Sequence, residues 1–274
     1  MPSSPARQPD ARADGGAQHR LTSMLQFKPT ARAVELLCNP VKPDVGTVTA
    51  TMVTARVGAP RYDFCISLGA GELAYAFSAF LHPEGMGSKE THYTIRLQQF
   101  DETTPAGETF CSKLVCSDDG SRYTFCDDPS NFYSWPRELG AAIITNDNMA
   151  VLIPRVQPSG ASAQFRVLSP LDSIITRFFA GQAREHLMML SGPWAPKNGD
   201  EVALVHLKDE ADSQLANDVV FRAHENGETL QVNFSAPLSP FQAFCIALAL
   251  IHHAQHVRNA AQLASGGSMG EGMG

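Results

Sequence analysis

The chain has 274 residues and a formal net charge of −7 at pH 7, and this length is enough for one large domain or two small ones with a sizeable core. Outside residues 1–44 the net charge is −9, from 15 Lys and Arg against 24 Asp and Glu. This acidic balance argues against nucleic acid as the main partner.

Both ends of the chain have compositions that are typical of disorder. Residues 1–20 combine Pro, Gly, Ser and charge with almost nothing to bury, and residues 265–274 read SGGSMGEGMG. Residues 21–38 allow two interpretations, which are a partner-binding helix at 31–37 or a short strand or helix packed on the folded body. We therefore expect a disordered or partner-binding segment at 1–44.

The middle of the chain is dominated by apolar residues at every second position. Tyr62, Phe64, Ile66 and Leu68 alternate with polar or small residues, and 93–97 repeats the pattern. Alternation of this kind predicts strands with one face in contact with solvent. Further strands are predicted at 46–57, 74–81, 139–145, 149–156 and 202–207.

Two hairpin turns and one outer helix are also predicted between the ends. Residues 118–120, Asp-Asp-Gly, separate FCSKLVCS from SRYTFCD, and Asn226-Gly227 joins VVFRAHE to ETLQVNF. Residues 171–189 carry Ile, Phe, Leu and Met at roughly helical spacing after Ser-Pro. That spacing predicts a helix packed on the outside of a sheet.

A second helix, at 241–251, is apolar on every side. Ser239 is a suitable N-cap, and Pro240 suits the first helical position. Gln242 is the only polar residue from 241 to 251. An amphipathic surface helix would show a single apolar stripe, and a membrane span needs roughly 20 apolar residues. This helix must therefore be enclosed by the rest of the protein.

The strands and the apolar helix together predict a closed barrel. Many strands with solvated outer faces must bury their inner faces, and closure removes the exposed sheet edges. A barrel of many strands is too wide for its own side chains to fill. We therefore expect the helix to fill the barrel, with the following residues in the core: Phe241, Phe244, Cys245 and Leu248.

The segment LQVNFSAPLSPFQAFCIAL resembles the closing signature of the tubby C-terminal domain, an alternating strand, a Pro-Leu-Ser turn and a helix that opens with Gln-Ala-Phe. Other stretches are similar to strands of the family in the same order, among them GTVTATMVTARVG, RYDFCISL, THYTIRL, FCSKLVCSDDGSRYTFCD, RELGAAIITN and LMMLSGPWAPKNGDEVALVHL. The likeness covers roughly 45–253. It implies a mainly β fold at 45–258, a closed antiparallel barrel of about twelve strands around a central apolar C-terminal helix, followed by a disordered tail at 259–274.

The resemblance also implies a phosphoinositide-binding module. The family's lipid site uses a Lys and an Arg two apart on one strand, which places both on one strand face, with an Asn on a neighbouring strand and a basic loop. Here Lys113 keeps the lysine, but Val115 replaces the Arg and His92 replaces the Asn. The basic loop is reduced to HPEGMGSKE, in which Lys89 is the only cation. Arg122 replaces a family lysine.

These departures predict weaker headgroup binding, centred on Lys113 with Lys89, His92 and Arg122 as helpers. Losing two or three charge-assisted bonds should weaken binding by several kcal/mol, at about 1.5–3 kcal/mol each. Two alternatives to this headgroup site stay open. One is that Lys113 is merely a solvated strand lysine. The other is that the chain is a tubby-like protein-interaction module that has lost phosphoinositide binding.

By the same resemblance, the expected partners are phosphoinositide headgroups at the inner membrane surface, and membrane-protein cargo or the intraflagellar transport machinery. The expected location is cytoplasmic, peripheral at the plasma or ciliary membrane. The six cysteines lack CxxC spacing and no signal peptide precedes them, which also indicates a reducing compartment. We expect a monomer without cofactor, metal or catalytic residues.

Two motifs raise the question of other chemistry. His252 and His256 lie four apart and are suited to one helix face as metal ligands, but no HExxH pattern or third ligand is evident. We expect them instead where the buried helix emerges into water. Residues 69–71, Gly-Ala-Gly, resemble half of a dinucleotide-binding fingerprint but precede a strand, which favours a turn. An enzyme of unrecognised type remains an alternative, and it would require a deep pocket with clustered titratable groups.

Overall fold

The computed structural model describes residues 31–55, 60–82, 91–97, 111–127, 137–156, 165–167, 169, 172–182, 184–195, 201–207 and 218–266. The helices and strands run in this order along the chain: α2 Ala31–Cys38, η1 Pro43–Val45, β1 Val48–Ala55, β2 Arg61–Gly69, β3 Glu72–His82, β4 His92–Arg96, β5 Cys111–Cys116, β6 Arg122–Asp127, β7 Arg137–Ile144, β8 Asn148–Pro154, β9 Phe165–Arg166, α3 Ile174–Phe179, η3 Arg184–His186, β10 Leu187–Pro193, β11 Val202–Leu207, β12 Val219–Asn226, β13 Thr229–Phe234 and α4 Pro240–Gly266.

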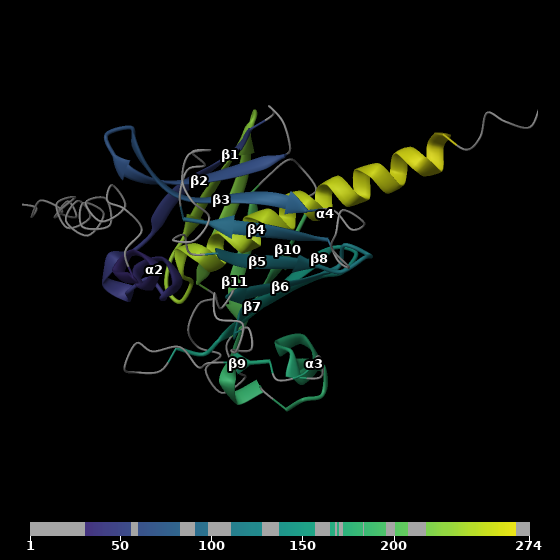
Figure 1. Ribbon diagram of the computed structural model, residues 1–274, viewed down its shortest axis with the longest axis horizontal. Helices are drawn as coiled ribbons and strands as arrows, with labels where there is room; N and C mark the ends of the chain where they lie inside the picture. The colour runs from purple at the N-terminus through teal and green to yellow at the C-terminus, as the bar shows by residue number, and fades with distance from the viewer. Residues whose placement is uncertain are drawn as a thin grey trace, which may run out of the picture.

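Twelve of these strands form a closed antiparallel barrel. The strand order is β6-β5-β4-β3-β2-β1-β13-β12-β11-β10-β8-β7, and β6 also pairs with β7, which closes the wall. The short strand β9 extends the sheet outside this ring by pairing with β7. Figure 1 shows α4 running through the strands. The predicted barrel of about twelve strands around the C-terminal helix is confirmed.

The turns and alternating strands lie close to where the sequence places them. Gly120 and Gly227 have φ values of +62° and +64°, and this left-handed conformation is open to glycine at little cost. They join β5 to β6 and β12 to β13. In β2 and β4 the alternate side chains from Tyr62 and Tyr93 onward are buried. The alternation of side chains along these strands therefore separates an inner face from an outer face.

The start of α4 is fixed by a reciprocal cap. The backbone N–H of Gln242 donates to Ser239 Oγ at 3.1 Å, and the backbone N–H of Ser239 donates to Gln242 Oε1 at 2.9 Å. Such a capping box satisfies two backbone donors that the helix itself leaves without partners. Gln242 Nε2 also donates to the Leu139 carbonyl of β7 at 2.7 Å. The only polar residue of the enclosed stretch thus ties the helix to the wall.

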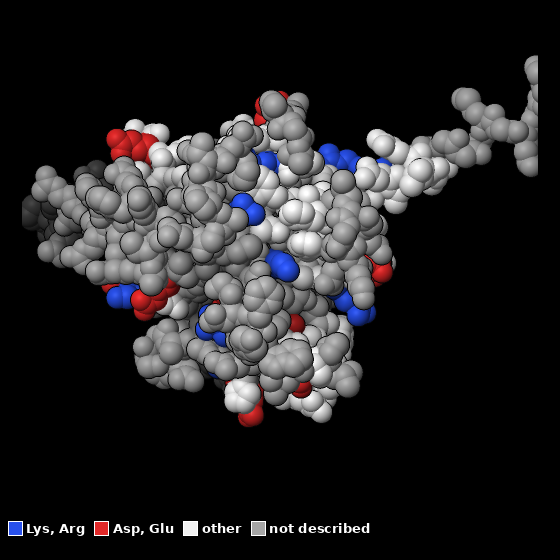
Figure 2. All heavy atoms as spheres, in the orientation of Figure 1, with Lys and Arg blue, Asp and Glu red and all other residues white. Residues whose placement is uncertain are grey.

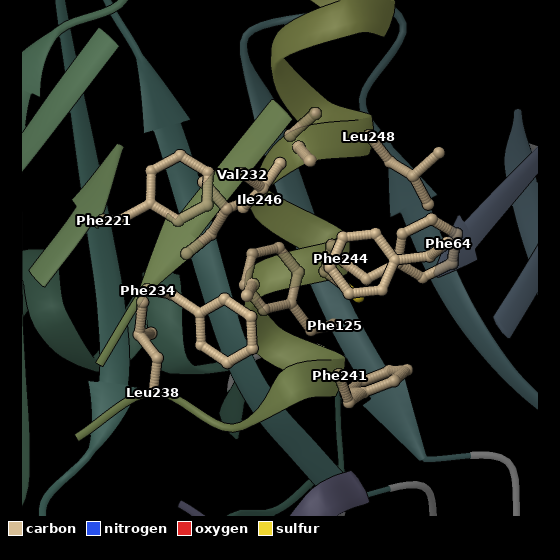
Figure 3. Packing of buried hydrophobic residues seen from close by; sticks show 14 of the residues in the cluster. Phe64, Phe125, Phe221, Val232, Phe234, Leu238, Phe241, Phe244, Ile246 and Leu248 are labelled. Atoms are coloured by element: carbon tan, nitrogen blue, oxygen red, sulfur yellow. The ribbon is translucent and has the colours of Figure 1, made fainter. Parts of the chain in front are cut away.

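The first half of α4 fills the barrel. Every side chain from 240 to 250 is buried, and Phe241, Phe244, Cys245 and Leu248 have no exposed surface. The Phe244 ring stacks on Phe77 of β3 with centroids 5.5 Å apart, and lies 5.0 Å from Phe64 of β2. Figure 3 shows aromatic side chains from the wall on both sides of the helix. The interior is therefore a packed core.

The second half of α4 leaves the barrel. His252 is partly exposed, and Val257 and Leu263 are 42% and 81% exposed. The helix continues to Gly266, past residue 258 where the sequence placed the end of the folded domain. In Figure 1 this part projects away from the strands. The expectation that the histidines mark the point of emergence is confirmed.

The helix predicted at 171–189 is wrong over most of its length. The α-helix covers only Ile174–Phe179, and Leu187–Pro193 form β10, a strand of the barrel wall between β8 and β11. Gly181 follows the helix with φ +72°, a conformation that ends helices. The apolar residues of this segment therefore belong to two elements, a helix and a strand, in which side chains repeat with different periods.

Residues before β1 also contribute to the core. Leu37 of α2 is 1% exposed, and Val41 is buried and donates its backbone N–H to the Leu238 carbonyl at 2.9 Å. Of the two interpretations of residues 21–38, a helix packed on the body describes Ala31–Cys38. The residues from 1 to 30 lie outside those that the structure describes, as does the tail from 267.

Candidate functional site

The outer face of β3, β4 and β5 gathers several basic side chains. Thr94 of β4 lies at the centre, directly opposite Lys113 of β5 on one side and Phe80 of β3 on the other. His92 and Arg96 precede and follow Thr94 by two residues, so they share its face at about 6–7 Å along the strand. His82 of β3 pairs with His92. We call the outward side chains of His82, His92, Thr94, Arg96 and Lys113 the Thr94 face.

The spacing of the Thr94 face suits one multiply charged anion. Lys113 is diagonal to both His92 and Arg96, and diagonal neighbours on adjacent strands lie about 7–8 Å apart. Three side chains that carry or can gain positive charge therefore surround one strand position. A phosphorylated ligand resting on Thr94 would be within reach of all three, since charged hydrogen bonds to phosphate need only a few ångströms of side-chain extension.

The histidines of the Thr94 face sit in a positive electrostatic environment. The rings of His82 and His92 stack at 4.9 Å with an angle of 15° between their planes. The pKa of His82 is lowered by partial burial first, then by the neighbouring His92, Arg96 and Lys113. The mutual effect indicates that these four groups are close enough to repel one another. An anion bound among them would relieve that repulsion.

Lys113 and Arg96 are available for a ligand. Within the described part of the chain, neither side chain forms an ion pair with a carboxylate. The Arg96 guanidinium lies 5.9 Å from the centre of the Phe80 ring, a contact that holds the stem in place and leaves its donors open. Lys113 is half-buried on the barrel wall.

The residues expected from the sequence are only partly brought together. Lys113 and His92 share the Thr94 face, and Val115 lies opposite His92 with its half-buried aliphatic side chain. Arg122 is on β6, four residues from Cys126, the partner of Lys113, and this is about 13 Å along the strand. Its guanidinium contacts the ring of Phe179 instead. Lys89 lies outside the described residues.

Sequence reasoning missed His82 and Arg96 as members of this face. The alternation of HYTIR places Arg96 on the same side as His92, so a signal for Arg96 exists. His82 joins the group through the pairing of β3 with β4 across a long connection, and no local pattern specifies that register. Figure 2 shows separate Lys and Arg side chains among the described residues on the face toward the viewer.

The histidines of α4 are held by the barrel rim. His252 Nδ1 lies 3.2 Å from the Tyr123 hydroxyl, and its ring meets Tyr93 and Tyr123 edge-on. His253 Nδ1 lies 2.7 Å from the Gly120 carbonyl and its ring meets Trp194. Burial, then His256 and His253, lowers the pKa of His252 to about 4. Through these contacts the two histidines attach α4 to the end of the barrel from which the helix emerges.

Neither a cluster of metal ligands nor a membrane-spanning helix is present among the described residues. Among the His, Cys, Asp and Glu side chains that the structure describes, no group of three or more could hold a metal ion. In the same residues, no helix combines the length and the apolar character needed to cross a bilayer.

The buried cysteines are protected thiols. Burial raises the pKa of Cys116 to about 12, and that of Cys245 well above its ordinary value. For the half-buried Cys38, partial burial and then Asp127 raise the pKa to about 12, against the opposing effect of Arg137. Since the thiolate is the reactive form, these side chains pack as small apolar groups.

Comparison with known proteins gives no assignment: no protein-family model matches the chain, and no curated protein matches it.

Proposed function

We propose that this protein is a non-catalytic, tubby-like module that binds phosphoinositide headgroups through its Thr94 face and so attaches to the inner surface of a membrane. The grouping of Lys113, Arg96 and His92 around Thr94 carries the proposal. Each charge-assisted bond to phosphate contributes about 1.5–3 kcal/mol. Three such bonds suit a headgroup with more than one phosphate. They compensate in part for the loss of the arginine that the family has at the position of Val115.

A binding role is favoured over catalysis because of where the functional groups lie. The interior of the barrel is occupied by the side chains of α4. The basic side chains of the Thr94 face project from an open strand surface, where a charged ligand is held but water is not excluded. Such a surface suits recognition of a headgroup, whereas acid–base chemistry profits from an enclosed site.

The same face predicts that binding strengthens on acidification. His82 gains positive charge as the pH falls, and its lowered pKa places this protonation below the ordinary value of 6.5. An added charge near Lys113 would strengthen the attraction for phosphate. Headgroup affinity is therefore expected to be higher at about pH 5.5 than at about pH 7.5.

The test is vesicle binding by a matched pair of lysine variants. Lys113→Gln and Lys42→Gln each remove one charge, but Lys42 is exposed before η1 and away from the Thr94 face. With phosphatidylcholine vesicles that contain phosphatidylinositol bisphosphate, Lys113→Gln should lower the affinity by about tenfold, and Lys42→Gln should not. Binding should also weaken at high salt, because exposed contacts are screened. Equal binding of both variants and the wild type would reject the site.

A cytoplasmic adaptor role in ciliary or membrane-protein trafficking completes the proposal, by the resemblance to the tubby family. The partner would be membrane-protein cargo or the intraflagellar transport machinery. Deletion of residues 1–30 tests a role of the N-terminal segment better than deletion of 1–44, because Leu37 and Val41 belong to the core. Unchanged recovery of a transport partner by the truncated chain would count against an adaptor segment.

The second candidate is a tubby-like protein-interaction module without phosphoinositide binding. The observation that favours it is Val115, an aliphatic side chain on the outer face where the family has an arginine. Wild-type protein that binds phosphatidylcholine vesicles equally with and without the phosphoinositide would support this candidate over the first.

A further inference from the structure

The short helix α3 presents an aromatic pair on the outside of the barrel. Phe179, its last residue, is 64% exposed, and its ring meets that of the half-buried Phe178 edge-on at 5.7 Å. Figure 1 shows α3 beyond the barrel wall, well apart from α4. A single exposed apolar side chain is common on protein surfaces, so only the neighbours of Phe179 can indicate what it contacts.

The position of Phe179 is fixed by the packing of α3. Ile174 and Ile175 are buried in a second apolar cluster, together with Leu152 of β8 and Leu187 of β10. The N-cap Ser173 accepts from the Thr176 N–H at 3.1 Å, and the buried Glu138 of β7 accepts from the Ile174 N–H. These contacts anchor the first turn of α3 to the wall, while Phe179 at the other end of the helix stays exposed.

A cation lies over the exposed ring of Phe179. The Arg122 guanidinium of β6 lies 5.9 Å from the centre of this ring. Arg177, two residues earlier on the same helix, pairs with Asp172 at 3.1 Å instead. An aromatic ring with an arginine beside it matches the boundary of an anionic bilayer, where rings lie below the headgroups and cations lie among the phosphates.

The Phe179 ring and the Thr94 face are connected through neighbouring strands. Arg122, Thr124 and Cys126 alternate along the outside of β6, and Cys126 pairs with Lys113 of β5. Arg122 is therefore one strand away from Lys113 and about 13 Å along that strand, a separation that a single membrane surface is wide enough to cover.

We propose that Phe179, with the Arg122 guanidinium against its ring, forms an interfacial anchor that inserts into anionic phospholipid. This inference rests on the membrane-binding role proposed above. The anchor adds an apolar contribution to membrane affinity that does not depend on the lipid headgroup, so that a weak headgroup site still gives stable attachment.

The experiment separates the two sites by using soluble and membrane-bound ligands. Phe179→Ser should lower affinity for phosphatidylcholine vesicles with phosphatidylinositol bisphosphate by about tenfold, since burying one aromatic side chain contributes that much or more. It should leave binding of soluble inositol trisphosphate unchanged. Lys113→Gln should weaken both. Leu73→Ser is the control, because Leu73 is 53% exposed on β3 beside the acidic Glu72, and it should affect neither.

A fluorescence reporter keeps the anchor testable even if the headgroup site fails. Phe179→Trp, read as the difference from the wild-type emission, should shift to the blue on vesicles rich in phosphatidylserine and should be quenched by brominated lipid. Leu73→Trp should show neither change. If soluble headgroup binding is absent but the emission of the Phe179→Trp variant shifts, the Thr94 face is wrong and the anchor stands. If the emission does not change on any vesicle, or Phe179→Ser binds vesicles like the wild type, the anchor is overturned.

Discussion

The inner and outer faces of the same barrel wall differ in how strongly they constrain the sequence. Inside, Phe64 and Phe77 contact Phe244 of α4 from two strands, and all three side chains are fully buried. Outside, Lys113 is half-buried on the wall and pairs with no carboxylate that the structure describes. The interior is therefore specified by packing, while the outer face is open to change and can carry function.

The contrast predicts its largest effect at the centre of α4. Phe244→Ala should lower the free energy of unfolding by about 3–5 kcal/mol, because it leaves a cavity in a closed core. Leu263→Ala removes an apolar side chain from the emerged end of the same helix and should cost less than about 0.5 kcal/mol. Urea unfolding of both variants checks this. Similar losses for the two would contradict the placement of the helix.

A buried carboxyl group on the outer side of the wall, that of Glu138, should have an effect of intermediate size on stability. Burial beneath α3 raises the pKa of Glu138 from 4.5 to about 7, against the opposing effects of the Ile174 N–H and Arg177. The folded state then holds this proton more tightly than the unfolded state, so its stabilising contribution is complete below about pH 4.5 and is lost as the pH rises through about 7. The loss amounts to about 3 kcal/mol at most.

Glu138→Gln isolates that contribution. The amide oxygen keeps an acceptor for the Ile174 N–H and removes the titration, so the variant should gain stability relative to the wild type between about pH 5 and about pH 8. Subtracting the free energy of unfolding of the wild type from that of the variant cancels the contribution of every other titrating group. Urea unfolding at both pH values measures it, and a constant difference would show that Glu138 does not titrate in this range.

The smallest of the three effects concerns the start of α4. Ser239→Ala removes the acceptor of the Gln242 N–H and should cost about 1 kcal/mol. Ser239→Thr keeps a hydroxyl acceptor without burying a charge and should recover most of the loss, as thermal unfolding would reveal. Equal destabilisation by both would mean that the site is sensitive to any change of side chain rather than to the cap.

The elements that could be predicted are those whose signals are local. Asn226-Gly227 specifies a tight turn, Ser239 and Pro240 specify a helix start, and the alternation from Tyr62 specifies a strand with two unlike faces. The all-round apolar character of 241–251 leads to enclosure, because no stripe is left for solvent. Each of these conclusions depends on residues within about ten positions of one another.

What could not be predicted depends on contacts between distant residues or on ambiguous spacing. Leu187 and Met188 follow the phenylalanines of α3 at an interval that also fits a helix, although the turn at Gly181 and the short helix η3 separate the two elements. His82 joins His92 through the register of two strands. Arg122 meets Phe179 because α3 packs across the wall, and no pattern in the sequence anticipates this contact.

The most direct test of the enclosed helix is amide hydrogen exchange along α4. Residues 241–250 should exchange only through global unfolding, together with the central strands, while 257–266 should exchange much faster. The boundary should fall near His252 and His253, where the rim holds the helix. Rapid exchange throughout 241–250 under native conditions would contradict a barrel closed around this helix.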